Sequence, residues 1–245
     1  MQNDFDMPAA RWLMTYPKGP YRFVNREYLI LSYRTDEHKL LSLLPQGVEL
    51  LSPLVKYEFI RMPDSTGFGD YTESGQVIPV KVKGEEGTLT LSMFLDCHAP
   101  IAGGREIWGF PKKYAKPHLF VEDDVLIGTL DYGSIRIATA SMGYKQQLLN
   151  PSDVSHGLEK PLFLLKNIPG VDGKPLVNQL TKTYLTDIKV KGAWSGPGAL
   201  ELHPHALAPI AYLPVLEILQ VQHFICDLTL PYGEVVIDYL KDKNK

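Results

Sequence analysis

The sequence predicts a β-dominated fold, a barrel or a sandwich assembled from many short strands. Apolar and polar residues alternate over short runs, as in residues 88–96, where every second side chain is apolar. Turn residues recur between these runs, for example at 131–134 and 171–174. Patterns of helical period are scarce, and the long helices that join the strands of a parallel sheet are missing. These observations favour a mainly β (α+β) protein.

The first elements follow from local composition. Residues 1–20 predict an N-terminal arm of irregular structure that packs through its large side chains, Trp12, Leu13 and Tyr16. A strand is expected over 28–33, which is rich in aromatic and branched residues. Thr35 or Asp36 then caps a short leucine-rich helix, and Pro45 ends it.

The run 54–62 alternates as a strand and carries a candidate functional carboxylate. Residues two apart on a strand share a face, so Glu58 is expected beside Leu54, Ile60 and Met62. That is an apolar neighbourhood for a charged group. Residues 63–70 predict a loop.

The remaining elements are mostly strands. In the run 76–83, Pro79 favours an edge strand or a bulge. Residues 99–108 predict a short helix that Gly103 and Gly104 weaken. The other expected strands cover 88–96, 117–122, 125–131, 134–141, 161–168, 175–191, 198–203, 215–230 and 233–240.

Composition narrows the classes of function. The 245 residues contain 44% apolar residues and carry a net charge of −3, which is ordinary for one globular domain, here expected over residues 1–245. The charge gives no reason to expect nucleic acid or an anionic membrane as a partner. No run is long and apolar enough to span a membrane, and the N-terminus lacks the pattern of a signal peptide. Cys97 and Cys226 form no CxxC motif, which favours a reducing cytoplasm.

The stretch 109–114, Gly-Phe-Pro-Lys-Lys-Tyr, contains two adjacent lysines after a proline. Proline fixes its own φ and favours an extended backbone in the residue before it. If Lys112 and Lys113 are extended as well, their side chains point to opposite faces. One of Lys112 and Lys113 could then enter a pocket while the other stays in solvent. A buried lysine loses its proton readily and becomes a nucleophilic amine. The alternative is a solvated basic turn.

Two further groups of residues could carry chemistry. Glu201, His203 and His205 have the i, i+2, i+4 spacing that aligns three metal ligands on a strand, but Pro204 interrupts it and no fourth ligand is evident. The alternative is two surface or structural histidines. Arg26, Glu58 and Glu73 lie beside strong turn and strand signals. The alternatives are that Arg26 pairs with a nearby carboxylate and that Glu58 and Glu73 lie on solvated rims. The common nucleotide, hydrolase and zinc-protease motifs are absent.

Several of these segments resemble acetoacetate decarboxylase in order and spacing. The resemblance extends from about residue 17 to 240 and rests on the segments 19–21, 25–28, 71–76, 104–106, 111–113, 128–133, 140–145 and 238–240. It implies a closed, cone-like antiparallel β-barrel with a few short helices, which assembles into large homo-oligomers. It also implies that neither a metal nor another cofactor is needed.

The resemblance implies roles for individual residues. Lys112 corresponds to the lysine that forms a Schiff base, and Lys113 to the second lysine of the motif. The active-site arginine and two glutamates of the family correspond to Arg26, Glu58 and Glu73. Phe110 is a departure from one member of that family, in which a tyrosine precedes the proline, so a hydroxyl near Lys112 is lost. Glu201 and His203 have no counterpart in that pattern, which lowers the weight of the metal site.

The expected reaction is the decarboxylation of acetoacetate to acetone and CO₂ through an imine, a form of nucleophilic covalent catalysis for which this family is an established example. The reaction needs a neutral amine, whereas an ordinary lysine has a pKa of about 10.4. Burial and a neighbouring cation such as Lys113 both disfavour the ammonium, and we expect burial to dominate because the two side chains point apart.

The sequence is also compatible with other functions. The same lysine chemistry serves aldolase-dehydratases and decarboxylases of larger keto acids. A non-catalytic β-barrel binding module would leave Lys112 exposed to solvent. A metal-dependent enzyme would hold an ion at His203 and His205.

Overall fold

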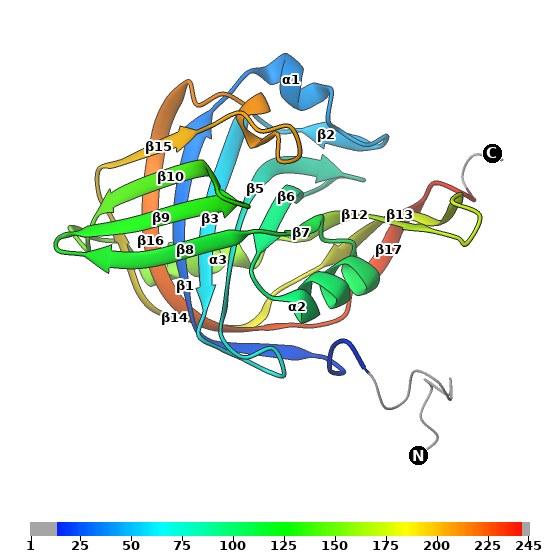
Figure 1. Cartoon of the computed structure of the whole chain (residues 1–245), viewed down its shortest axis with the longest axis horizontal. Coiled ribbons are helices and arrows are strands. Elements are labelled where there is room, and N and C mark those ends of the chain that lie inside the picture. Colours follow the sequence, from blue (N-terminus) through cyan, green and yellow to red (C-terminus); the bar gives the residue numbers. More distant parts are fainter. Residues whose placement is uncertain (1–13, 242–245) are drawn as a thin grey trace.

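The computed structural model describes residues 14–241, and strands dominate it (Figure 1). The predicted contacts of Trp12 and Leu13 lie outside the described residues. The strands are β1 (Tyr21–Arg34), β2 (Val48–Leu50), β3 (Leu54–Met62), β4 (Asp64–Ser65), β5 (Tyr71–Val82), β6 (Glu85–Leu95), β7 (Lys112–Tyr114), β8 (Lys116–Glu122), β9 (Val125–Tyr132), β10 (Ile135–Gly143), β11 (Gln147–Leu148), β12 (Leu162–Pro169), β13 (Pro175–Thr183), β14 (Thr186–Ser195), β15 (Gly198–Leu202), β16 (Glu217–Leu230) and β17 (Glu234–Asp238). The helices are α1 (Glu37–Leu41), α2 (His98–Gly103), the π-helix η1 (Gly104–Trp108), α3 (Pro151–Leu158) and the 3₁₀-helix η2 (Ile210–Tyr212).

The strands form two sheets. A 13-stranded sheet follows the order β11-β14-β16-β1-β3-β5-β6-β12-β13-β17, with β2, β4 and β7 paired beside this path. A 4-stranded sheet, in the order β15-β10-β9-β8, is the predicted meander with β15 added. Most pairs are antiparallel, as expected. Strand β6 is the exception, because it pairs in parallel with both β7 and β12.

The expected closed barrel is wrong for this chain. Within residues 14–241 the large sheet begins at β11 and ends at β17, and these two strands do not pair with each other. Closure requires matched tilt and stagger around the whole ring. Here the hairpin of β12 and β13 instead extends away from the body of the molecule and carries the end of the sheet with it (Figure 1).

The two faces of the large sheet pack against different parts of the molecule. One face packs on the 4-stranded sheet through a core that includes Leu31, Tyr57 and Phe59 with Leu126 and Leu130. The other face carries a second core, which includes Tyr28, Ile60 and Met93 and packs against Trp108 of η1 and Val154 of α3. Strands such as β5 are therefore buried along almost their whole length. The second core contains the candidate site.

Local predictions agree with the structure where turn and cap chemistry is strong. Asp36, and not Thr35, caps α1 by accepting a hydrogen bond from the backbone N–H of Lys39. On one side of β5, the pairing with β3 ends at Val77 and the pairing with β2 begins at Val80. Pro79 lies in the gap between these two pairings. Pro79 pairs with Thr88 of β6 on the other side of the strand, so a residue without an N–H is tolerated because the side at the gap alone requires no ladder bond.

Three local predictions need correction. The expected strand 175–191 is two strands, because the chain leaves β13 at Thr183 and begins β14 at Thr186. The expected loop 63–70 contains the short strand β4, which pairs with β1. Helix α3 was not predicted, although Asn150 caps it and Pro151 occupies its first turn. It is short, and only Val154 of its residues is fully buried, so its apolar period is weak.

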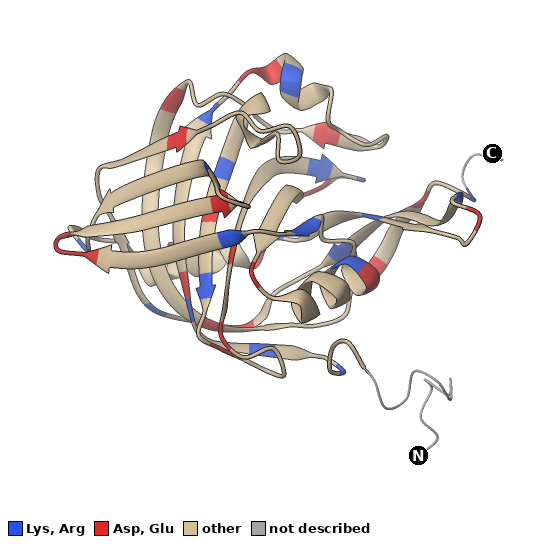
Figure 2. Ribbon diagram, in the orientation of Figure 1, with Lys and Arg blue, Asp and Glu red and all other residues tan. Residues whose placement is uncertain are grey.

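Charged residues of both signs are interspersed over the elements (Figure 2). This distribution agrees with the small net charge of −3. Among the described residues, every helix falls short of the length and apolarity that crossing a membrane requires.

Candidate active site

A cavity of about 90 Å³ lies within the second core, beside the end of β7. A volume of this size exceeds the space one water needs and is smaller than a cavity of about 150 Å³ that holds benzene. Its walls are mainly aromatic and aliphatic. Its charged lining residues are Arg26, Glu58, Glu73 and Lys112. All four candidate catalytic residues from the sequence therefore meet in one cavity.

The Pro-Lys-Lys stretch is extended, as predicted, and forms β7. Lys112 is only 7% exposed, and its amine lines the cavity. Lys113 is exposed and turns away, where its ammonium donates a hydrogen bond to the carbonyl of Leu207 at 2.6 Å and lies 5.1 Å from the centre of the Tyr132 ring. The two adjacent amines thus belong to different environments. The alternatives of a solvated basic turn and of a binding module with an exposed Lys112 do not fit this arrangement.

Strand register brings the two glutamates to the face on which Lys112 lies. Lys112 pairs with Met93, Met93 with Gly75, and Gly75 with Glu58, so these four positions form one row across four strands. Glu73 lies two residues before Gly75 and therefore on the same face. Its Oε1 atom lies 2.5 Å from Nζ of Lys112, and both side chains are almost completely buried.

The Glu58 carboxyl has an altered affinity for protons. Burial raises the pKa of Glu58 to about 7, and the nearby charge of Glu73 acts in the same direction. Lys56 and Arg26 oppose the shift. A carboxyl with this pKa can both hold and release a proton near neutral pH, which is what general acid–base catalysis requires.

Arg26 enters the cavity because β1 contains a bulge. The pairing of β1 with β16 shifts between Phe23 and Arg26, and Asn25 within this interval has a left-handed φ of 55°. Asparagine tolerates that conformation better than most residues. Its N–H donates to the carboxylate of Asp227 at 2.8 Å, which holds the bulge in place. Bulges commonly redirect a side chain beside an active site.

The guanidinium of Arg26 is buried between two aromatic rings. It lies 5.0 Å from the ring centres of both Phe23 and Tyr28. Its Nε has no hydrogen-bond partner among residues 14–241. A buried, unpaired N–H on a cation is costly to leave unsatisfied, so this group is suited to an anionic ligand that enters the cavity.

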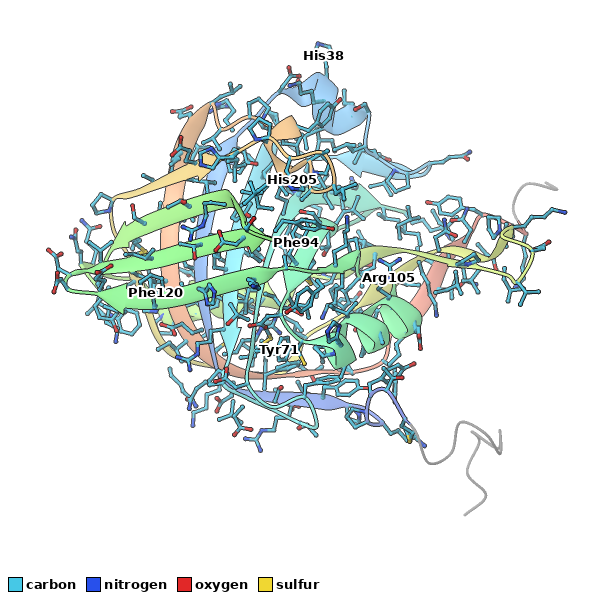
Figure 3. All side chains as sticks on the ribbon, viewed as in Figure 1. His38, Tyr71, Phe94, Arg105, Phe120 and His205 are labelled. Atoms are coloured by element: carbon cyan, nitrogen blue, oxygen red, sulfur yellow. The ribbon has the colours of Figure 1, made fainter. Side chains whose placement is uncertain are left out.

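Aromatic side chains line part of the cavity, and the sequence alone identified only some of them. Phe110 was expected near the lysine, and its ring centre lies 5.2 Å from Nζ of Lys112. Tyr71 and Trp108 also line the cavity, and neither was singled out (Figure 3 shows Tyr71). Trp108 is held by its indole N–H, which donates to the carbonyl of Pro231 at 2.9 Å. This contact joins residues far apart in sequence, so no local signal could reveal it.

The Glu201-His203-His205 group does not form a metal site. Only Glu201 and His203 approach each other, at 3.9 Å, and His205 uses its Nδ1 atom to accept a hydrogen bond from the N–H of Leu207. Within the described part of the chain, no cluster of three histidine, cysteine or carboxylate side chains could hold a metal ion. Figure 3 shows His205 well separated from Tyr71, which lines the cavity.

The chain is similar to known proteins over nearly its whole length. The model of the family described as acetoacetate decarboxylase matches residues 6–240. A curated acetoacetate decarboxylase from Chromobacterium violaceum is 58% identical over 240 residues, which cover 98% of this chain and 97% of the relative. One from Paraburkholderia xenovorans is 61% identical over 98% of this chain and 94% of the relative.

A solved structure agrees with these relatives. The crystal structure of acetoacetate decarboxylase from Legionella pneumophila superposes with a TM-score of 0.94 at 71% identity, and the match covers 96% of this chain and 94% of that one. The resemblance first seen in short motifs thus extends to the fold and to most of the sequence. The chain belongs to the acetoacetate decarboxylase family.

Proposed function

We propose that this chain converts acetoacetate to acetone and CO₂, and that Lys112 forms the Schiff base. The observation that carries the proposal is the buried amine of Lys112, which lies 2.5 Å from a buried carboxylate in a cavity that also contains one buried arginine. Membership of the family supports the same reaction.

The first half of the reaction forms an electron sink. Glu73 takes a proton from the amine of Lys112, and the neutral nitrogen attacks the keto carbon of the substrate. Proton transfers then allow water to leave, and a protonated imine remains. The positive nitrogen sits two bonds from the carbon that carries the carboxylate. It therefore draws in the electron pair that the carbon–carbon bond releases when CO₂ departs.

The second half returns the enzyme to its starting state. Loss of CO₂ leaves an enamine, and a proton is added to its terminal carbon. Water then attacks the imine carbon, and acetone leaves as the Lys112 amine is regenerated. Glu58 and Glu73 are the two carboxyl groups in the cavity that can move these protons. The pKa of about 7 at Glu58 suits it to both donation and acceptance.

Arg26 is proposed to position the substrate carboxylate. A guanidinium matches a carboxylate in shape and charge, and the Nε atom of Arg26 is available for this contact. The carboxylate becomes neutral CO₂ during the reaction, so tight binding of the anion would slow the chemical step. Phe23 and Tyr28, which flank the guanidinium, limit its movement.

Lys113 and Phe110 are proposed as supporting residues. The Lys113 ammonium lies outside the cavity and contacts the carbonyl of Leu207, so its proposed role is indirect. Phe110 contributes an apolar surface beside the amine. The cavity of about 90 Å³ favours a small keto acid over the larger substrates that an aldolase-dehydratase would need.

Three broader features complete the proposal. Residues 1–245 act as one domain. The protein works in the cytoplasm as a large homo-oligomer. The reaction requires neither a metal nor another cofactor, because the imine supplies the electron sink.

Reductive trapping tests the proposed reaction. The protein is incubated with acetoacetate and sodium borohydride, and peptide mapping locates the isopropyl group that reduction of the acetone imine would leave. We expect modification of Lys112 together with release of CO₂. Lys112→Arg should abolish both, whereas Lys113→Arg, the matched control, should retain them. An unmodified Lys112 with acetoacetate intact would refute the proposal.

A further inference from the structure

Helix α2 and the π-helix η1 pass directly beside the side chain of Lys112, and two glycines occupy their junction. We propose that Gly104 is a positioning residue that sets the place of the Lys112 amine, because it leaves room for the lysine methylene groups against the helix backbone. This inference concerns the same site and rests on the proposed function. Gly104 lines the cavity but has no side chain that could take part in the reaction, so its proposed effect is exerted through the position of Lys112.

The side chain of Lys112 occupies the space into which a β-carbon at position 104 would project. A β-carbon added at Gly104 would lie 2.6 Å from Cδ, 2.9 Å from Cε and 3.3 Å from Nζ of Lys112. Two of these separations are shorter than any ordinary contact between carbon atoms. The three nearest atoms all belong to the lysine, so its side chain fills the volume that any other residue at position 104 would need.

Backbone conformation does not require glycine at this position. Gly104 has φ −61° and ψ −43°, which every residue adopts in a helix. Gly109 at the end of η1 differs, because its φ of 95° does favour glycine. The requirement at position 104 is therefore one of space alone.

The backbone on both sides of the contact is held in place. The carbonyl of Gly104 accepts hydrogen bonds from the N–H groups of Gly109 and Phe110, each at 3.0 Å. The N–H of Lys112 donates to the carbonyl of Phe110 at 2.7 Å, and the guanidinium of Arg105 donates to the carbonyl of Lys112 at 3.2 Å. A methyl group at position 104 is therefore accommodated by movement of the flexible lysine side chain. That movement takes Nζ away from Glu73.

The neighbouring glycine provides a matched control. Gly103 has nearly the same helical backbone, with φ −60° and ψ −41°. A β-carbon there would meet only the ring of Tyr16 among its nearest atoms, at 3.0 to 3.4 Å. Tyr16 also donates a hydrogen bond to Glu106 at 2.6 Å and lines no part of the cavity. The two glycines thus clear space for different partners, and only Gly104 serves the amine.

The test compares Gly104→Ala with Gly103→Ala and the wild-type chain. A misplacement of about 1 Å can lower a catalytic rate about 100-fold, so we expect kcat of Gly104→Ala to fall by about that factor. KM should change much less, since Arg26 still positions the substrate. The rate at which borohydride traps Lys112 should fall in parallel with kcat. In a crystal structure of the variant, Nζ should lie beyond hydrogen-bonding distance of Glu73, and Gly103→Ala should resemble the wild type in every measurement.

If Gly104→Ala folds poorly, measurements of Tm show whether a clash with Lys112 is the cause. A clash with Lys112 should disappear in Gly104→Ala/Lys112→Ala, whose Tm should equal that of Lys112→Ala. An equal loss of Tm in both backgrounds would overturn the inference, as would a Gly104→Ala variant with normal kcat and an unmoved Nζ. A wild-type chain without decarboxylase activity would refute the proposed function instead, and the crystal structure of Gly104→Ala would still decide where the amine lies.

Discussion

Nζ of Lys112 and Oε1 of Glu73 lie 2.5 Å apart, with both side chains buried away from solvent. The two residues come from β7 and β5, which are separated by β6 in the large sheet. A carboxylate in this position can take the proton that the amine must lose before it attacks a carbonyl carbon. The pair therefore links the fold directly to the first chemical step.

Replacing the carboxylate of Glu73 tests this link. Glutamine keeps the shape of the side chain but cannot accept the proton, so Glu73→Gln should lower kcat about 100-fold or more. Steady-state assays of CO₂ release measure the effect. Glu85→Gln is the control, since Glu85 pairs with Lys182 at 2.8 Å outside the cavity. A Glu73→Gln variant with near-normal kcat would remove Glu73 from the catalytic group.

Loss of the buried Arg26 guanidinium should lower the catalytic efficiency towards acetoacetate. A hydrogen bond to a charged group contributes about 1.5–3 kcal/mol, so Arg26→Gln should lower kcat/KM about 10- to 100-fold. Initial rates over a range of acetoacetate concentrations give this quantity. Arg136→Gln, which removes a cation paired with Asp131 on the surface, should leave kcat/KM unchanged. Equal values for the two variants would mean that Arg26 does not contact the substrate.

Glu58 should make stability depend on pH. Its pKa is about 7 in the folded protein and near 4.5 when unfolded, so the folded state binds more protons between these values. The contribution of Glu58 to the free energy of unfolding is greatest below about pH 4.5. It declines as the pH rises from about 4.5 to about 7, and it is constant at higher pH. As the pH rises from 4.5 to 8, the free energy of unfolding of Glu58→Gln should therefore increase by about 1–3 kcal/mol relative to that of the wild type.

Urea unfolding at several pH values measures this difference. Glu217→Gln is the control, because Glu217 is exposed and forms a surface ion pair with Arg34. Loss of this exposed ion pair should change the free energy of unfolding only slightly. A difference between Glu58→Gln and the wild type that stays constant over the same pH range would show that the Glu58 carboxyl titrates alike in the folded and unfolded chains.

Removal of the second lysine separates burial from charge repulsion. The ammonium of Lys113 contacts the carbonyl of Leu207 and faces away from the cavity, so Lys113→Met should leave the pH dependence of kcat/KM almost unmoved. The measurement is a pH–rate profile for acetoacetate. A displacement of that profile by about two pH units would instead establish direct repulsion between the two amines.

Most strands were predictable because their signals are local. Residues 54–62 alternate in polarity and form β3 with the same bounds, and the expected meander of 117–141 forms β8, β9 and β10. The opposite directions of Lys112 and Lys113 also followed from the alternation of side chains along an extended backbone. Such predictions need only the period of a strand and the geometry of a few residues.

Other features escaped the sequence because distant contacts decide them. Gly103 and Gly104 suggested only a weak helix, whereas in the structure they clear space for Tyr16 and Lys112. The bulge that turns Arg26 into the cavity depends on a hydrogen bond from Asn25 to Asp227, some 200 residues away. Closure of the sheet was expected, but within residues 14–241 the sheet stays open, because the hairpin of β12 and β13 leaves the body of the molecule (Figure 1).

The sequence by itself determined that the chain is mainly β, that it resembles a family of Schiff-base decarboxylases, and which four charged residues to examine. Tertiary structure decided that these four share one cavity, because their positions depend on the register of β1, β3, β5, β6 and β7. A shift of one residue in any of these pairings would turn a side chain to the opposite face of the sheet. Local patterns specify which residues form a strand, but only packing across the whole sheet selects the register that brings an amine and a carboxylate together.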